Sequence, residues 1–194
     1  GDGGGVVVGW CGVLGHWAGE EAQWAAARKK VVENWAKKGR PTVIAACPTC
    51  QTTLAEHMGI EAMGLFEWLE REGAAGEKRT GVPPVMTLHH ACGARHRPDL
   101  RQSVENLCAT AGITLRPQKD PSEQAPCCGY GGLVPFVDAQ VAEQITEVAL
   151  EQLEPQAETP LLTYCVNCRD RYLAKGREAW HLLEILCPDA PGVR

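Results

Sequence analysis

The sequence predicts an α/β fold, built as two pseudo-duplicated modules with short, largely parallel sheets flanked by helices. Two observations support this prediction. Short apolar stretches with strand character alternate with longer stretches in which apolar residues recur with helical period. The same succession of cysteine, helix, strand and cysteine pair also occurs twice along the chain. Because strands alternate with helices, parallel strand pairing is favoured.

The internal repeat is defined by the spacing of cysteines. In the first copy 35 residues lie between Cys11 and Cys47, and in the second copy 36 residues lie between Cys128 and Cys165. Cys11 and Cys128 are each followed by glycine, and each later cysteine begins a Cys-x-x-Cys pair. Two copies of one module are the simplest explanation of this agreement.

The modules are separated by a stretch rich in glycine, proline and charge at residues 73–84. We therefore predict a first module at residues 1–75 and a second at residues 84–194. Each module ends with a similar tail that contains tryptophan, leucine and glutamate, at residues 64–69 and 180–186. The first residues, Gly-Asp-Gly-Gly-Gly, resemble a processing edge, so we expect that the chain is incomplete at this end.

The individual elements follow from apolar patterning. Strands are expected at residues 42–46, 85–89, 113–115 and 161–164. Helices are expected where apolar residues form stripes of period 3.6. The three stripes are Trp24, Ala27, Val31 and Trp35; Leu100, Val104, Leu107, Cys108 and Ala111; and Val137, Val141, Ile145, Val148, Ala149 and Leu153.

The composition is that of a globular protein without a nucleic-acid or membrane role of its own. The chain has 194 residues, 44% of them hydrophobic and 22% charged. A net charge of -5 disfavours nucleic acid as a partner, because phosphate binding requires a basic surface. No apolar run approaches the ~18 residues that span a bilayer, and no secretory signal is visible. We expect a cytoplasmic protein whose association with a membrane, if any, runs through a partner subunit.

Ten cysteines are the most informative feature of the composition. Both Cys-x-x-Cys pairs have a spacing that lets two sulfurs face one metal, and the vicinal pair Cys127-Cys128 closes a disulfide only with strain. Without a secretory signal, reduced thiols and metal binding are favoured over disulfides. Soft thiolates select iron–sulfur clusters, zinc or copper(I).

The second module combines five cysteines at regular spacing. They are Cys92, Cys127, Cys128, Cys165 and Cys168. Five sulfurs exceed the four that a tetrahedral zinc site or an ordinary cubane cluster uses. A zinc site on four of them, or disulfides, are the alternatives left open by the residues alone.

These spacings make the chain similar to the CCG cysteine-rich domain family. Its signature is a cysteine, then Cys-Cys-Gly, then Cys-x-x-Cys, at intervals of thirty-odd residues and usually present twice. The family includes the B subunit of heterodisulfide reductase and related lactate, glycolate and glycerol-3-phosphate oxidoreductase subunits. The resemblance extends over about residues 6–186, and Cys92, Cys127, Cys128, Gly129, Cys165 and Cys168 match the signature.

The resemblance implies an oxidoreductase function. It implies that all five matched cysteines bind a noncubane [4Fe-4S] cluster, which passes electrons to a disulfide or another small acceptor. The chemistry would be centred on the cluster, so no catalytic side chain is assigned. Ferredoxin-like or flavin-containing redox subunits are the implied partners, and a larger complex is the implied setting. The substrate itself is not specified by a five-thiolate motif.

The first module departs from the family signature. Trp10 occupies the position of the first vicinal cysteine, and the upstream cysteine would precede the chain. The three that remain, Cys11, Cys47 and Cys50, are candidates for a second metal. Zinc with His16 or His57 as a fourth ligand, a relic of a lost site, and completion by a partner chain all stay open. The alternative function is therefore a zinc-stabilised, non-catalytic assembly or anchoring module of a larger redox complex.

Four residues near the motif are given less functional weight. Cys108 lies on an apolar helix stripe and is expected to be a buried hydrophobic residue. Cys187 has no partner at a meaningful spacing and is expected to be an exposed or half-buried thiol. His89 and His90 closely precede Cys92, and we favour strand histidines with satisfied hydrogen bonds over a role near the cluster.

Overall fold

The computed structural model describes residues 11–73, 80–117, 124–153 and 158–187. The chain divides into two compact units between Met63 and Gly64. Trp10 and the glycine-rich start lie outside the described residues, as do residues 74–79 of the expected boundary stretch.

The first unit is a small α/β assembly with one short sheet. Its elements are α1 (Val13–Trp17), α2 (Glu21–Lys37), β1 (Val43–Ala45), α3 (Pro48–Met58) and β2 (Ala62–Gly64). Strands β1 and β2 form a two-stranded sheet. One cluster of buried apolar residues consists of Ala45, Leu54 and Ile60, against which one side of α2 packs, and Trp24 of α2 is buried as well. Helix α3 begins at Pro48, where the missing N–H of proline costs no hydrogen bond.

The second unit holds the larger sheet and most of the helices. Its elements are α4 (Leu65–Arg71), β3 (Val85–His89), η1 (Cys92–Ala94), α5 (Pro98–Thr110), β4 (Thr114–Leu115), η3 (Gly131–Leu133), α6 (Val134–Val137), α7 (Ala139–Leu153), β5 (Leu161–Thr163), α8 (Val166–Ala174), β6 (Ala179–His181) and α9 (Leu182–Leu186). Among the described residues of both units, no helix is long and apolar enough to cross a membrane.

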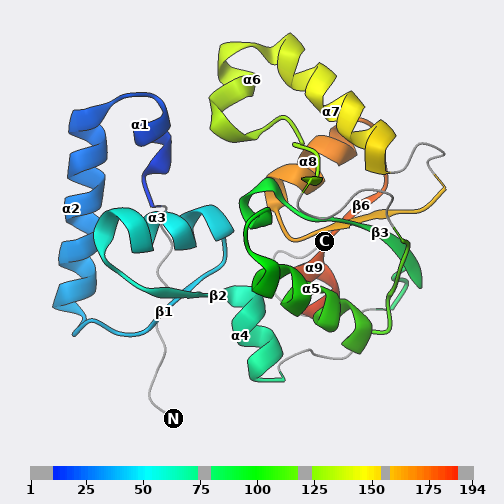
Figure 1. Ribbon diagram of the computed structural model, residues 1–194, viewed down its shortest axis with the longest axis horizontal. Coiled ribbons are helices and arrows are strands. Elements are labelled where there is room, and N and C mark those ends of the chain that lie inside the picture. The colour runs from blue at the N-terminus through cyan, green and yellow to red at the C-terminus, as the bar shows by residue number, and fades with distance from the viewer. Residues whose placement is uncertain (1–10, 74–79, 118–123, 154–157, 188–194) are drawn as a thin grey trace. The chain divides into compact units, whose positions relative to one another are not determined.

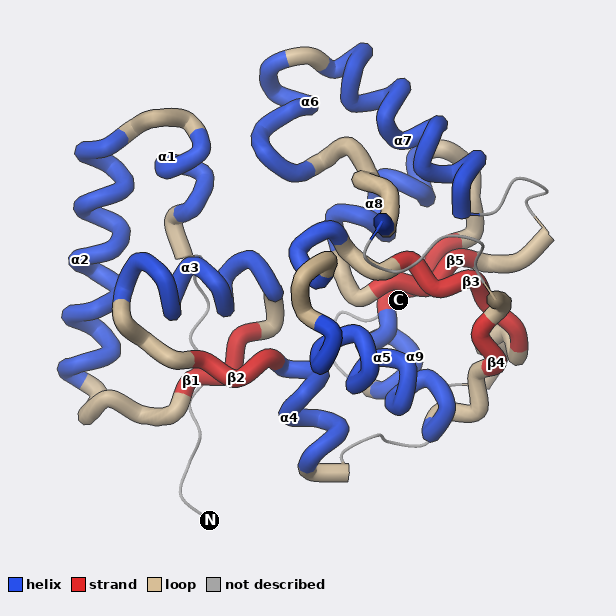
Figure 2. Tube along the Cα trace, viewed as in Figure 1, coloured by secondary structure: helices blue, strands red, loops and turns tan. Residues whose placement is uncertain are grey.

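The four strands of this sheet run in parallel in the order β4-β3-β5-β6, and Figure 2 labels β3, β4 and β5 among them. From β3 the chain crosses to β4 on one side and later returns to β5 and β6 on the other. Such a reversal is a topological switch point, here between β3 and β5. Because parallel crossovers are right-handed, the helices after β3 and after β5 are expected on opposite faces. Figure 1 shows α5 and α9 on one face and α7 and α8 on the other.

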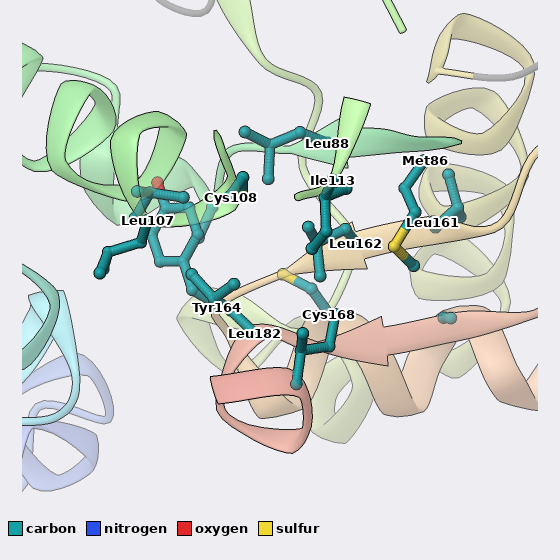
Figure 3. Packing of buried hydrophobic residues seen from close by; sticks show 14 of the residues in the cluster. Met86, Leu88, Leu107, Cys108, Ile113, Leu161, Leu162, Tyr164, Cys168 and Leu182 are labelled. Atoms are coloured by element: carbon teal, nitrogen blue, oxygen red, sulfur yellow. The ribbon is translucent and has the colours of Figure 1, made fainter. Parts of the chain in front are cut away.

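The core of the second unit lies on both faces of β3 and β5. Met86, Leu88, Leu161 and Leu162 are almost completely buried, and Figure 3 shows them beside Cys168 and other core residues. The stripe predicted on residues 100–111 is confirmed, because all five of its members are buried. Cys108 is among them, as expected for a small hydrophobic residue.

Helix α4 packs into the second unit although it follows the last strand of the first. Phe66 and Leu69 belong to the large core, and Glu67 forms an ion pair of 2.7 Å with Arg97. The predicted module limits, 1–75 and 84–194, stay a prediction about the repeat, because repeats and compact units need not share boundaries.

The predicted α/β fold with short parallel strands is confirmed, but one helix stripe is only partly right. Its members Ala149 and Leu153 are buried, whereas Val137 at the end of α6 and Val141 and Val148 on α7 are exposed. The buried face of α7 consists of Ala142, Thr146, Ala149, Leu150 and Leu153. The face is rotated because the turn after the vicinal cysteines packs against Ala142 and Thr146.

Candidate metal centre

The five predicted cysteines lie around the carboxyl ends of β3 and β5. His89, the last residue of β3, is in register with Thr163, the last residue of β5. Cys92 follows the first strand by three residues and Cys165 follows the second by two. The carboxyl ends of parallel strands at a switch point are the usual place for a ligand in an open α/β sheet. The topology therefore places these thiols at the ligand-binding edge.

The pair Cys165 and Cys168 begins helix α8. Cys165 is the N-cap residue with an extended backbone, φ -124° and ψ 118°. Free N–H groups and the positive end of the helix dipole favour anionic sulfur at this position. Cys168 is 1% exposed and packs beside Tyr164 in the core (Figure 3).

The vicinal pair is held in a turn that only glycine can complete. Gly129 has φ 84°, and a Cβ there would lie 2.5 Å from the carbonyl oxygen of Ala142. The buried Thr146 hydroxyl lies 2.9 Å from the carbonyl oxygen of Cys128 and 2.9 Å from that of Ala142. It also accepts hydrogen bonds from Arg171 at 2.7 and 3.1 Å. The turn is thereby fixed on helix α7.

The five thiols interact in two groups. The hydrogen bond with Cys92 lowers the pKa of Cys127 to about 6, with further help from the N–H of Gly129, and the pKa of Cys92 is raised. Cys168 shares its proton with Cys128 and Cys165; these hydrogen bonds and burial raise the pKa of Cys168, and the pKa of Cys128 is lowered.

The two groups are also close to each other. The negative charges of Cys127, Cys128 and Cys165 help to raise the pKa of Cys92. The structure therefore brings all five predicted residues together, with Cys92 exposed and Cys128 and Cys168 buried. The site is open at one end and closed at the other.

His89 connects the strand to the loop before the vicinal pair. Its Nε2 lies 3.0 Å from the carbonyl oxygen of Pro126, and its Nδ1 lies 3.1 Å from the hydroxyl of Tyr172. A carbonyl only accepts, so Nε2 carries the proton and Nδ1 accepts from Tyr172. Burial lowers the pKa of His89 to about 4. The imidazole is therefore neutral, and its two hydrogen bonds link the loop of Pro126 to Tyr172 of helix α8.

His90 makes a parallel set of contacts. Its Nδ1 lies 3.2 Å from the hydroxyl of Tyr164, and its Nε2 lies 3.2 Å from a carboxylate oxygen of Glu105. Both histidines are thus buried and hydrogen-bonded, as favoured from the sequence. Each is paired with a tyrosine that flanks the second Cys-x-x-Cys pair.

Arg95 provides positive charge beside the more exposed group of thiols. Its guanidinium donates to the carbonyl oxygen of Ala125 at 2.7 Å. Its charge is one of the influences that lower the pKa of Cys127, after the hydrogen bond with Cys92. The same contact ties the turn after β3 to the loop before the vicinal pair.

The three cysteines of the first unit also come together. The Cys50 thiol donates to Sγ of Cys11 at 3.1 Å and is hydrogen-bonded to Cys47 as well. These hydrogen bonds lower the pKa values of Cys11 and Cys47 to about 6 and raise that of Cys50. The rings of His16 and His57 contact each other with their centroids 5.1 Å apart and their planes tilted by 54°.

A family comparison bears on both groups of cysteines. The cysteine-rich domain family CCG matches the chain over residues 10–55 and 86–170, which together exceed half of its length. The chain belongs to the CCG cysteine-rich domain family. CCG domains occur in iron–sulfur redox subunits, and the match supports a general iron–sulfur redox role. The curated proteins compared with the chain give no match.

The donor set of the second CCG segment consists of five thiols. Within the described ranges, no three cysteine, histidine or carboxylate side chains are arranged around one point as ligands of a single ion. The thiols instead hydrogen-bond in two neighbouring groups. A cluster distributes its thiolates over several irons, whereas zinc requires four ligands around one ion. Five soft donors close together are consistent with metal or iron–sulfur binding at this edge of the sheet.

Sequence reasoning missed the residues that brace the CCG turn and the cysteine-bearing loops. Tyr164 directly precedes Cys165, and Tyr172 lies one helical turn after Cys168, so proximity along the chain could have indicated both. Arg95 lies three residues after Cys92 and has the same signal. Thr146 has none, because it reaches the site through contacts that only the folded chain shows.

Proposed function

We propose that the chain is an iron–sulfur redox subunit that passes electrons to a disulfide or another small acceptor. In this proposal a noncubane [4Fe-4S] cluster is held by Cys92, Cys127, Cys128, Cys165 and Cys168. The supporting observation is the meeting of these five thiols at the switch point between β3 and β5. Membership of the CCG family supports the same role.

The cluster would supply one-electron chemistry at a potential set by its burial and by hydrogen bonds to sulfur. The chain contributes such hydrogen bonds. The N–H of Gly129 lies 3.4 Å from Sγ of Cys127, and the N–H of Tyr130 donates to Cys128. Each donor favours negative charge on sulfur, as does the guanidinium of Arg95.

The surrounding side chains keep the inner thiols away from water. Cys168 and Tyr172 are buried, and His89 stays neutral between Tyr172 and the loop of Pro126. Cys92, by contrast, is exposed. An acceptor would therefore approach from the Cys92 end, where the positive charge of Arg95 is also found.

The partners in this proposal are ferredoxin-like or flavin-containing subunits in a cytoplasmic complex. These partners would supply electrons to the cluster one at a time. Two such transfers are needed, because the reduction of a small disulfide takes two electrons. The net charge of -5 disfavours nucleic acid in the same role.

The proposal is tested by metal analysis of anaerobically purified protein. We expect about four irons per chain with acid-labile sulfide. Cys128→Ser should abolish iron binding, because it removes a buried thiol of the vicinal pair. Cys187→Ser is the matched control, since Cys187 is a half-buried thiol outside the five. It should keep the iron content of the natural chain.

Two results would contradict the cluster. Zinc without iron or visible absorption would favour the assembly or anchoring module. Unchanged iron content in Cys128→Ser would remove the vicinal pair from the ligand set.

A further inference from the structure

Two buried polar atoms near the five thiols have no hydrogen-bond partner within the described part of the chain. They are Oγ1 of Thr163 and Nε of Arg95. Thr163 is 0% exposed and lies two residues before Cys165. Buried hydroxyl and N–H groups are nearly always paired, because an unpaired group loses its hydration without compensation. An unpaired donor beside a candidate metal centre therefore indicates a partner that the chain itself does not supply.

We propose that the Thr163 hydroxyl donates a hydrogen bond to an anionic sulfur of the proposed iron–sulfur centre and raises its reduction potential. This inference rests on the proposed function and deepens it, because it assigns a residue that regulates the potential of the same centre. Arg95 is not included. Its charge acts on the potential even without a hydrogen bond, and its guanidinium already donates to the carbonyl oxygen of Ala125.

The sheet places the Thr163 side chain on the face that leads to the thiols. Thr163 ends β5 and is in register with His89 of β3, and registered neighbours in a parallel sheet point to the same face. His89 contacts Tyr172 of helix α8 and the carbonyl oxygen of Pro126, in the loop before the vicinal pair. Helix α8 covers this face and begins with the second Cys-x-x-Cys pair (Figure 1).

The next residue points to the opposite face, as successive residues of an extended chain do. The hydroxyl of Tyr164 lies 3.2 Å from His90, which in turn contacts Glu105 of helix α5. Helix α5 covers the other side of the sheet from α8 (Figure 1). The Thr163 hydroxyl is therefore buried on the α8 side, two residues from the first cysteine of the pair.

A hydroxyl at this position acts on the potential without binding iron. Reduction adds negative charge that is shared by the sulfurs of a cluster, so a hydrogen bond to sulfur is stronger in the reduced state. The reduced state is stabilised more than the oxidised state, and the potential rises. Threonine is uncharged, so this effect does not depend on its protonation.

Thr87 provides a matched control for Thr163. It is 1% exposed and lies on β3 two residues before His89, and therefore on the same face. Its hydroxyl, however, lies 3.0 Å from the hydroxyl of Thr159. The two threonines share residue type, burial and face, and they differ in whether the hydroxyl has a partner in the chain.

The first measurement is urea unfolding of metal-free protein. In Thr163→Val a methyl group replaces an unpaired buried hydroxyl, so the folding equilibrium constant should stay the same or rise. In Thr87→Val it should fall about fivefold, because the hydroxyl of Thr159 loses its partner. A fall of that size in Thr163→Val would show that its hydroxyl is paired within the chain and would overturn the proposal.

The second measurement is an anaerobic redox titration of the iron-loaded proteins, followed by electron paramagnetic resonance. Thr163→Val should lower the equilibrium constant for one-electron reduction about tenfold, which is about 59 mV in potential. Thr163→Ser should keep the potential of the natural chain, because it retains the hydroxyl. Thr87→Val should keep it as well.

Iron analysis separates this inference from the proposed function. Thr163 is not a ligand, so its variants should bind as much iron as the natural chain. Absence of iron from the natural chain would contradict the proposed function itself. Iron at the expected content, with the same potential in Thr163→Val as in the natural chain, would overturn this inference alone. The titration decides the question even if the metal-free variants do not fold.

Discussion

Two glycines show most directly how single residues shape the repeated cysteine turns. Gly12 and Gly129 follow the equivalent residues Cys11 and Cys128, and their φ values are 78° and 84°. A Cβ at Gly12 would lie 2.6 Å from Cβ of Ala27, much as one at Gly129 would meet Ala142. The two turns thus press against helices α2 and α7, respectively, and this close approach excludes any side chain.

Gly129→Ala should destabilise the protein by at least about 2 kcal/mol, because it combines a left-handed backbone with a steric clash. Gly131→Ala is the matched control, since a Cβ there meets nothing within 4 Å and its φ is not positive. Urea unfolding of the two metal-free variants measures the difference. Equal midpoints would show that the turn relaxes away from α7.

His89 makes stability depend on pH. Burial lowers the pKa of His89 from 6.5 to about 4. Between pH 6.5 and pH 4 the imidazole is therefore protonated in the unfolded chain but stays neutral in the folded chain. Stability is therefore full above about pH 6.5 and falls as the pH drops toward 4. The loss can reach about 3 kcal/mol.

His89→Gln should flatten this part of the pH profile. An amide can donate to the carbonyl of Pro126 and accept from Tyr172, but it does not titrate in this range. The free energy of unfolding of metal-free protein, measured from pH 4 to 8, gives both slopes. Parallel curves for the two proteins would mean that another group is responsible.

At the scale of elements, helix α7 explains why one prediction was only partly right. The predicted stripe combined residues of two faces, with Val141 and Val148 on the exposed face and Ala149 and Leu153 on the buried one. Periodicity alone cannot choose between them. The choice is made by the turn at Gly129, which docks on Ala142 and Thr146 from a distant part of the sequence.

Truncations on α7 should reveal the orientation of the helix. Leu150→Ala should cost about 2 kcal/mol or more, because Leu150 is 9% exposed in the core. Val148→Ala should change stability by less than about 0.5 kcal/mol, since Val148 is 51% exposed. Thermal or urea unfolding of the pair provides the comparison. A larger loss at Val148 would contradict the orientation.

The strands were easier to predict than the stripe of α7. β1, β3, β4 and β5 fall within the expected stretches, because β-branched and apolar residues between turn signals mark buried parallel strands. β2 and β6 were not expected. They contain only three residues each, among them glycine, tryptophan and histidine, so no alternation identifies them.

At the scale of the whole molecule, α4 joins the tail of one repeat to the core of the next. Phe66 and Leu69 are buried with the residues of the second unit. A fragment of residues 64–194 should therefore unfold cooperatively. A fragment of residues 84–194 should lose about 4 kcal/mol or more, because two large side chains no longer fill the core.

Circular dichroism and urea unfolding of the two fragments measure this difference. Phe66→Ala in the longer fragment is an intermediate case, since it removes one of the two side chains. Equal stability of the fragments would show that α4 contributes little to the core.

The cysteines of the candidate site could be predicted from the sequence, but the residues that hold the cysteine-bearing loops in place could not. Spacing identifies Cys92 and Cys165 because each follows a recognisable strand. The braces arise from pairs far apart in sequence, such as Thr146 with Cys128 and Tyr172 with His89. No local pattern encodes such contacts, since they follow from how the chain folds back on itself.

The pairing of β3 with β5 has a consequence for biogenesis. Thr87 aligns with Leu161, so the loop that closes this pairing is long and its formation is entropically costly and slow. Until it closes, Cys92 remains apart from Cys165 and Cys168. Metal delivered to a nascent chain would meet scattered thiols, which oxidants could cross-link in wrong pairs. In the proposed function, loading of the centre would therefore follow folding and would require that the thiols stay reduced until then.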